Sequence, residues 1–354
     1  MGNRSSINIK GIELKSKFFF APINTGLASN GCPTEDLIQF HSLRSNEYTG
    51  INYVGNVAID IETVTNGKTL FINPSMENYS VLASTIKNKG SIPGVQVACF
   101  KSKFGAQTNW KNKKSADYVD FVKYEIGSLS VSQINQVIKS FQEGIKKLVS
   151  HGFEAIQIHG AHGYFLNNFL SETFNNRTDE FGKDRTLIIK EILDGIDSVV
   201  KSTIIDLRIS LFEEKFENEL TKKQTSYLDS IYKISGIDII SISNGIYNLD
   251  KKLIYPIKKK EDTFMLEILD DYFKTHNKKL WNVSGNVRNI KELISQNSEV
   301  TFSIGRSIIA DHDFIKKHFE NNVQDIVECC YKNQCHYYTL GKDFIECGVN
   351  KHLY

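Results

Sequence analysis

The densest run of polar side chains in the sequence follows one short apolar segment, residues 152–158. His159, His162 and Tyr164 come directly after it. The two histidines are three residues apart, a spacing that could seat a metal ion and serve a metal-dependent hydrolase. The carboxylates that such a site normally adds are missing where the other apolar segments end. A metal hydrolase is therefore the alternative rather than the preferred hypothesis.

A second candidate is Arg208, which lies inside the apolar segment 204–210. A buried guanidinium without a partner costs much free energy, so we expect an anionic group to face it. An internal ion pair with Asp206 or Glu213 is the alternative explanation. Two glycines, Gly285 and Gly305, follow later apolar segments, where backbone N–H groups could hold a phosphate.

The pattern of apolar residues predicts the strands and helices that would bring these side chains together. Strands are expected at 18–21, 51–59, 92–98, 155–158, 204–210, 237–242, 280–283 and 300–304. Helices are expected at 34–44, 81–89, 130–150, 187–200, 228–235, 264–273 and 287–294; the one over 130–150 has apolar residues every three or four positions. About eight strands alternating with helices predict a (β/α)8 TIM barrel over residues 1–320, followed by a C-terminal extension, 321–354. In such a barrel the polar residues at the carboxyl ends of the strands meet at one mouth.

Composition favours a small-molecule enzyme. The chain has 354 residues, 40% of them hydrophobic, and 43 basic against 41 acidic residues give a net charge of +2. We therefore expect no binding to nucleic acid or to an anionic membrane. No apolar run is long enough to span a bilayer, and the amino terminus lacks a signal core, although its first six residues match the short myristoylation pattern. We expect a cytoplasmic protein and leave a homo-oligomer open.

Residues 152–182 resemble the old yellow enzyme family of FMN-dependent oxidoreductases. The His-Gly-Ala-His-Gly-Tyr run at 159–164 and the Asn-Arg-Thr-Asp-Glu-Phe-Gly run at 176–182 carry the resemblance. It extends to the Ala-Pro pair at 21–22, to Gln96, and to the segments 207–210 and 304–310, and so covers about residues 7–320. Arg177 and Asp179 of the second run are expected to form a structural ion pair.

The resemblance implies bound FMN and NADH or NADPH as electron donor. The cofactor-binding residues that it implies are Ala21, Pro22, Ile23, Asn24, Asn56, Gln96, Arg208, Gly285, Asn286, Gly305 and Arg306. A flavin needs a donor or amide at its pyrimidine edge, which suits Gln96, and a positive charge near N1, which suits Arg208. The pairs at 285–286 and 305–306 would hold the phosphate.

The resemblance also implies a reaction. His159 and His162 would donate hydrogen bonds to the carbonyl oxygen of an α,β-unsaturated substrate, which gains negative charge as hydride arrives from flavin N5. Tyr164 would protonate the α-carbon, since a phenol with a pKa near 10 stays protonated at neutral pH. A rim tyrosine that only packs is the alternative for Tyr164. Alternative functions are a flavin reductase or oxidase that uses oxygen or quinone, and a non-catalytic flavin-binding protein.

Three departures from the family pattern motivate the non-catalytic alternative. Asn24 stands where relatives carry Thr or Cys, and Asn56 follows a glycine where an acidic residue is usual. After Gln96 the sequence reads Cys-Phe-Lys-Ser at 99–102 in place of the usual His-Ala-Gly-Arg. These changes touch the flavin and substrate rims, so flavin binding is expected to survive them better than the usual substrate range.

The C-terminal cysteines resemble the iron–sulfur tail of the dienoyl-CoA reductase branch. The four residues are Cys329, Cys330, Cys335 and Cys347. Two of them are adjacent, which departs from the usual cluster spacing, so we interpret the tail as a degenerate site without a metal. A bound cluster or zinc is one alternative, and free cysteines on a terminal helix are the plain one. Because the sequence ends at Tyr354, we expect electrons to come directly from a soluble nicotinamide.

Overall fold

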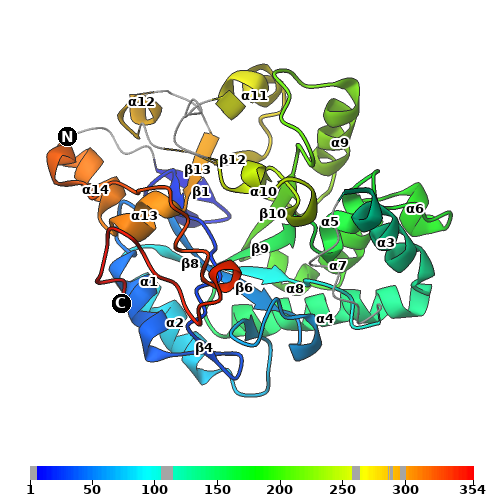
Figure 1. Ribbon diagram of the computed structural model, residues 1–354, viewed down its shortest axis with the longest axis horizontal. Helices are drawn as coiled ribbons and strands as arrows, with labels where there is room; N and C mark the ends of the chain where they lie inside the picture. The colour runs from blue at the N-terminus through cyan, green and yellow to red at the C-terminus, as the bar shows by residue number, and fades with distance from the viewer. Residues whose placement is uncertain (1–5, 105–114, 257–263, 286, 288–289, 296–299) are drawn as a thin grey trace.

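The computed structural model describes residues 6–104, 115–256, 264–285, 287, 290–295 and 300–354. Eight parallel strands form its centre: β3 (Phe18–Phe20), β6 (Ile51–Ala58), β8 (Ile92–Ala98), β9 (Ala155–Gly160), β10 (Ile204–Ser210), β11 (Ile239–Ser243), β12 (Leu280–Ser284) and β13 (Val300–Ile304). They pair in chain order, and β13 pairs back with β3 to close the ring. The predicted (β/α)8 barrel is thus confirmed, with helices around it (Figure 1).

The main outer helices are α1 (Glu35–Leu43), α2 (Glu77–Asn88), α4 (Val131–Ser150), α7 (Leu187–Asp194), α9 (Lys222–Tyr232), α11 (Phe264–Thr275) and α12 (Ile290–Ser295). Side-chain caps set several of their first residues. Thr34 accepts a hydrogen bond from the Leu37 amide at the start of α1, and Ser130 forms a capping box with Gln133 at the start of α4. The apolar stripe of α4 is buried, so this helix covers the outside of the barrel.

The amino-terminal end of the barrel is closed by a hairpin, β1 (Ile7–Ile9) and β2 (Ile12–Leu14). Leu14 packs with Phe19, Tyr53 and other residues from the lower ends of the strands. Lys10 at the hairpin turn forms an ion pair of 2.5 Å with Asp238. Because this end is sealed, a ligand is expected to reach the barrel interior from the carboxyl ends of the strands.

Several element boundaries differ from the sequence predictions. The helix expected over 187–200 is interrupted and continues as α8 (Asp197–Val200). The interruption lies at Ile196, whose φ of −117° and ψ of 14° depart from helical values. Helix α9 begins six residues before the predicted 228. The prediction missed its first turns because they carry no buried apolar residue. The hairpin β1–β2, helix α3 (Ser115–Ser128) and helix α10 (Tyr247–Ile254) had not been predicted.

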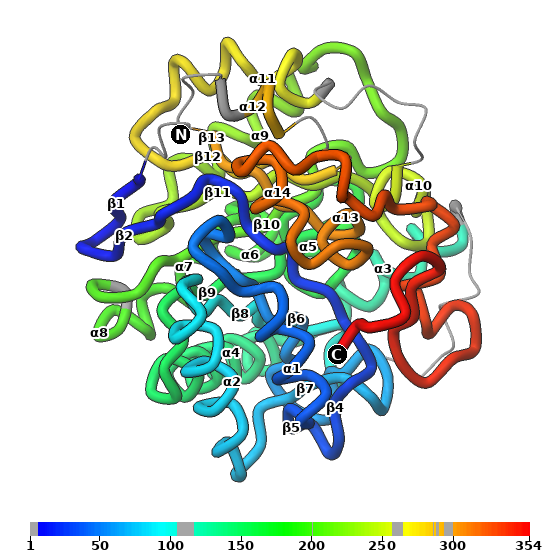
Figure 2. Tube along the Cα trace, turned by 90° about the vertical axis from the view of Figure 1, so that its left-hand side faces the viewer, coloured from blue at the N-terminus to red at the C-terminus, as the bar shows by residue number. Residues whose placement is uncertain are grey.

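Residues 321–354 cross the barrel mouth as an irregular tail that follows α13 (Arg306–Ala310) and α14 (Phe314–Phe319). The tail contains two single turns, η3 (Val323–Asp325) and η4 (Tyr337–Leu340), so the alternative of a terminal α-helix carrying the cysteines was wrong. Its Ile345 amide donates to the Thr25 carbonyl at 2.7 Å. Figure 2 shows the hairpin at the left and the tail at the right, at opposite ends of the barrel.

Candidate active site

The end of β9 brings His159, His162 and Tyr164 together. The ring centroids of His159 and His162 lie 5.2 Å apart, and those of His159 and Tyr164 lie 4.4 Å apart. All three side chains are buried. Gly163 makes the turn between them with φ of +83°, and a Cβ there would lie 2.8 Å from Ile246. The sequence therefore needs glycine at this position to fold the three side chains against one another.

Both histidines are neutral. Burial, followed by the nearby positive charge of Arg208, lowers the pKa of each imidazole well below its ordinary value. A neutral imidazole keeps one N–H donor and one acceptor nitrogen. His162 Nε2 lies 2.8 Å from Ser243 Oγ, whereas the buried Nδ1 of His159 has no hydrogen-bond partner. The pair thus has hydrogen-bonding capacity that the protein does not use.

Tyr164 holds its proton firmly. Burial raises the pKa of its phenol, and the hydroxyl lies 3.3 Å from Thr65 Oγ1. The ring meets Phe100 edge-on with centroids 5.1 Å apart. The hydroxyl is consequently oriented by one polar neighbour while the ring is held by aromatic contacts, an arrangement that suits a protonated acid.

Arg208 lies beside His159 in the strand register and points to the same mouth. Its Nη2 donates to Ser243 at 3.3 Å and to Ser284 at 3.5 Å, but its buried Nε has no partner. Neither Asp206 nor Glu213, both within the described ranges, forms a direct ion pair with it, so that alternative was wrong, although the charge of Asp206 acts on Arg208 at longer range. Burial lowers the pKa of the guanidinium. A buried cation with an unused N–H fits the anionic edge of a flavin.

The two glycines expected at the phosphate are not tightly packed, because a Cβ on either would make only ordinary van der Waals contacts. A Cβ on Gly285 would meet nothing nearer than 4.0 Å, and one on Gly305 nothing nearer than 3.7 Å. Asn286 lies outside the described residues. Arg306 is already engaged, because its Nη1 donates to Asn333 of the tail at 3.0 Å and its Nη2 to the Pro256 carbonyl at 2.6 Å. A phosphate here would be held by backbone N–H groups or would compete for Arg306.

The amides on the first strands are also engaged within the protein. Asn24 Nδ2 donates to Thr69 at 3.0 Å, and its Oδ1 accepts from the Tyr337 hydroxyl at 3.0 Å. Asn56 donates to Thr65 at 3.5 Å. Gln96 donates to Gln157 at 2.7 Å. The amides of Asn24 and Asn56 therefore shape the loops around the mouth.

The remaining predicted residues line the same end of β3. Ala21 donates its amide to the carbonyl of Ile304, and Ile23 lies near Gly305. Pro22 abuts Gly55, where a Cβ would lie 2.4 Å from the proline ring. The expected ion pair of Arg177 with Asp179 is present, and Arg177 Nη1 also donates to the carbonyls of α3 and the residue after it. This arginine thus fixes α3 against the loop that follows β9.

Sequence reasoning missed the residues that reach the mouth from loops and from the tail. Tyr247 of α10 lies 6.2 Å from His162 between ring centroids, and its hydroxyl contacts that of Tyr255. Tyr337 of the tail is buried and bonds to Asn24 and Asn66. No sequence motif marks these residues, because Tyr247 begins a short, kinked helix and Tyr337 lies in a single turn of the tail.

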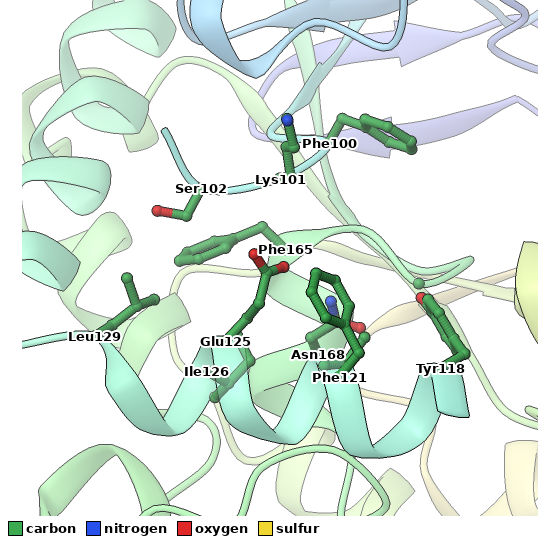
Figure 3. Close-up of a pocket in the computed structure, with 12 residues that line it drawn as sticks. Phe100, Lys101, Ser102, Tyr118, Phe121, Glu125, Ile126, Leu129, Phe165 and Asn168 are labelled. Atoms are coloured by element: carbon green, nitrogen blue, oxygen red, sulfur yellow. The ribbon is translucent and has the colours of Figure 1, made fainter. Parts of the chain in front are cut away.

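A small aromatic pocket adjoins this cluster at Gly163. Tyr118, Phe121 and Glu125 of α3 form one wall, and Phe100 and Phe165 lie opposite (Figure 3).

The tail cysteines carry free thiols in the structure. Burial raises the pKa of the Cys335 thiol to about 12, so that it stays protonated. Within the described residues, no group of three or more His, Cys, Asp or Glu side chains could hold a metal ion. In the same part of the chain, no helix is long and apolar enough to cross a membrane.

Comparisons with known proteins identify a family for the chain. Residues 5–325 match the model of the NADH:flavin oxidoreductase / NADH oxidase family. The chain is 26% identical to an NADPH dehydrogenase of Geobacillus sp. (strain WCH70) over 263 residues, 71% of this chain and 75% of that protein. It is 28% identical to an NADPH dehydrogenase of Clostridium acetobutylicum over 250 residues, 67% of this chain and 72% of that protein.

Two solved structures share the fold. A 2-naphthoyl-CoA reductase complex has a TM-score of 0.83 at 18% identity, over 99% of this chain; the chain spans 57% of the length of that reductase. The old yellow enzyme from Pichia sp. AKU4542 has a TM-score of 0.67 at 16% identity, over 91% of this chain and 87% of that one.

Proposed function

Because the chain belongs to the NADH:flavin oxidoreductase / NADH oxidase family, and is thus a flavin-dependent NAD(P)H oxidoreductase, we propose that it binds FMN and reduces the C=C bond of an α,β-unsaturated carbonyl compound. The observation that carries the proposal is the buried cluster of His159, His162 and Tyr164 beside Arg208, whose buried Nε has no hydrogen-bond partner. We propose NADPH as electron donor, after the names of the two related dehydrogenases.

The residues that would hold FMN are Arg208 and Gln96 at the ring and the backbone of Gly285 and Gly305 at the phosphate. When bound, FMN takes up hydride from the nicotinamide and supplies it to the alkene. Arg208 supplies fixed positive charge that favours a reduced, anionic ring. Its buried position makes this interaction stronger than it would be in water, because the surrounding dielectric is low.

The two histidines would bind the substrate carbonyl oxygen. Each is neutral and can direct an N–H at that oxygen, and His159 Nδ1 has no partner to release first. Negative charge grows on the oxygen as the alkene is reduced, so preorganised donors stabilise the transition state more than the ground state. Tyr164, held by Thr65 and next to His159, would then give its phenolic proton to the α-carbon.

The visible spectrum of the purified protein tests flavin binding, and anaerobic NADPH oxidation tests the reaction. We expect flavin absorbance and NADPH oxidation that depends on added cyclohexenone. A colourless protein that takes up no added FMN would refute the proposal. Bound flavin with NADPH oxidation by oxygen or a quinone, but none by an enone, would replace the ene-reductase with a flavin reductase or oxidase.

A non-catalytic flavin-binding protein is the second candidate. The contacts of the tail favour it, because Tyr337 hydrogen-bonds to the Asn24 amide and Asn333 hydrogen-bonds to Arg306. Both side chains at the mouth are therefore already engaged within the protein. This candidate predicts tight FMN binding without reduction by either nicotinamide. Stopped-flow mixing of the flavoprotein with NADPH and with NADH separates the two functions.

A further inference from the structure

A row of buried polar side chains crosses the barrel one layer below Arg208. Gln96 on β8, Gln157 on β9 and Asp206 on β10 are direct neighbours in the strand register. Gln96 Nε2 donates to Gln157 Oε1 at 2.7 Å, and Gln157 Nε2 donates to Asp206 Oδ2 at 2.6 Å. The exposed fractions of the three residues are 4%, 1% and 0%. They form one chain of hydrogen bonds, shielded from water, that ends at Gln96.

The carboxylate fixes the direction of both hydrogen bonds. An ionised carboxylate only accepts, so Gln157 must turn its NH2 group to Asp206 and its carbonyl oxygen to Gln96. That oxygen in turn requires the NH2 group of Gln96. The carbonyl oxygen of Gln96 is then the free end of the chain, and no described residue donates to it.

Core packing alone does not account for Asp206. Its Oδ2 also accepts from the Tyr53 and Ser241 hydroxyls, each at 2.9 Å, while its buried Oδ1 has no partner. Burial raises the pKa of this carboxyl to about 6 against the favourable effect of these hydrogen bonds, so it is mostly ionised at neutral pH. The positive charge of Arg208 offsets part of the cost of burying this carboxylate, but no described cation forms a direct ion pair with it, so its burial still costs folding free energy. This cost points to a role in the site above it.

We propose that Asp206 and Gln157 are positioning residues that hold Gln96 with its carbonyl oxygen toward the mouth, as a fixed acceptor for the N–H of the FMN pyrimidine ring. The inference rests on the proposed function for the identity of the ligand. That ring carries one N–H between two carbonyl oxygens, so the orientation of the Gln96 amide decides whether the edge is matched. The charge of Asp206 also opposes negative charge on the reduced ring and lowers its reduction potential.

Two variants test the orientation through FMN affinity, measured by flavin fluorescence on apo-protein at pH 7.5. Asp206→Asn can turn either an oxygen or an NH2 group to Gln157, and Gln157→Leu breaks the chain. We expect each to raise the FMN dissociation constant about tenfold. Tyr53→Phe is the matched control, because it removes a hydrogen bond to the same carboxylate without changing the amide chain, and its affinity should stay within twofold of wild type.

The midpoint potential separates the charge of Asp206 from its hydrogen bond. Compared with wild type, Asp206→Asn should bind reduced flavin about tenfold more favourably relative to oxidised flavin. This corresponds to a rise of about 30 mV in the midpoint potential of the two-electron couple. Gln157→Leu keeps the carboxylate and should leave the potential unchanged. If Asp206 and Gln157 only filled the core, their variants would not show weaker FMN binding in both together with a raised potential in Asp206→Asn alone.

FMN affinities of both variants within twofold of wild type would overturn the inference and leave the proposed function standing. If Asp206→Asn does not fold, the affinity of Gln157→Leu decides alone, because that change introduces no charge and removes only the hydrogen-bonded link between Asp206 and Gln96. A wild-type protein that binds FMN but reduces no enone refutes the proposed function and not the positioning role. A wild-type protein that binds no FMN overturns both.

Discussion

The ring of Tyr164 lies 4.4 Å from that of His159, while its hydroxyl turns away to Thr65 Oγ1 at 3.3 Å. The phenol therefore stands next to the proposed oxygen-binding pair without sharing its hydrogen bonds. A substrate held by the histidines would have its neighbouring carbon on the tyrosine side. This separation allows oxygen binding and proton donation to be tested independently.

Tyr164→Phe should slow enone reduction by about 10²-fold or more, the usual contribution of a positioned general acid. Flavin reduction by NADPH should stay within twofold of wild type, because the phenol takes no part in that half-reaction. Stopped-flow measurement of the two half-reactions provides the test. Tyr124→Phe on the exposed face of α3 is the matched control and should alter neither rate. Wild-type enone reduction by Tyr164→Phe would contradict the proton-donor role.

Arg208→Met should weaken the binding of reduced FMN much more than that of oxidised FMN, by about tenfold or more, because the fixed positive charge is lost. The apo-protein should be at least as stable as wild type, since a buried cation with an unpaired Nε is replaced by an apolar side chain of similar length. Potentiometric titration and urea unfolding of the apo-protein measure the two effects. Arg208→Lys keeps the charge and should retain part of the preference for reduced FMN.

The apo-protein should lose stability as the pH falls below 6.5. Burial lowers the pKa of His41 to about 4, and it lowers those of His159 and His162 well below their ordinary values. Below pH 6.5 these three histidines bind protons in the unfolded chain but not in the folded chain. The raised pKa values of Asp206 and Glu213 act in the opposite direction but involve fewer groups, so unfolding becomes easier. His41 alone accounts for about 3 kcal/mol between pH 6.5 and 4, at about 1.4 kcal/mol for each pH unit.

Urea unfolding of apo-protein at several pH values checks this slope. His41→Leu should be less stable at pH 7.5, because Asn52 loses the hydrogen bond of 2.7 Å to the imidazole. Its stability should nevertheless fall less steeply with decreasing pH. His352→Gln, an exposed change in the tail, serves as the control and should keep the wild-type slope. Equal slopes for His41→Leu and wild type would show that His41 is protonated in the folded protein.

The barrel could be predicted because its strands are short, largely apolar runs separated by helices or polar loops. The strands at 92–98, 204–210 and 300–304 occupy the predicted residues. The hairpin β1–β2 could not be predicted, because strands of three residues are too short to show a period. The start of α9 was placed too late because its first turns carry no buried apolar residue.

The site was predictable where one strand end carried the chemistry, as for His159 and Arg208. It was not predictable where distant segments meet. Tyr337 bonds to Asn24 across 313 positions in the sequence, and no local pattern encodes such a contact. Arg306 was expected at a phosphate, but its guanidinium bonds to Asn333 of the tail. The local sequence cannot show whether this arginine binds a phosphate or a distant side chain of the tail.

Arg44 binds the C-terminal end of the tail, and its replacement should make residues 321–354 more mobile over the barrel mouth. The side chain is fully buried and donates to the carbonyls of Phe40 at 2.7 Å and of Leu353 at 2.9 Å. Burial lowers the pKa of its guanidinium to about 9, which leaves it charged at neutral pH. Arg44→Met would leave these carbonyls without their donor, so we expect a loss of about 2–4 kcal/mol in unfolding free energy.

Limited proteolysis under native conditions tests whether that loss is local to the tail. In Arg44→Met, cleavage within residues 321–354 should accelerate before the barrel is cut, because the tail loses its bond at Leu353 while the strand pairing is unchanged. Lys351→Met removes a charge from an exposed tail position and should keep the wild-type cleavage rate. Equal rates of cleavage in tail and barrel would mean that Arg44 stabilises the whole barrel through α1, and that the tail is held by its other contacts, such as the bond from the Ile345 amide to Thr25.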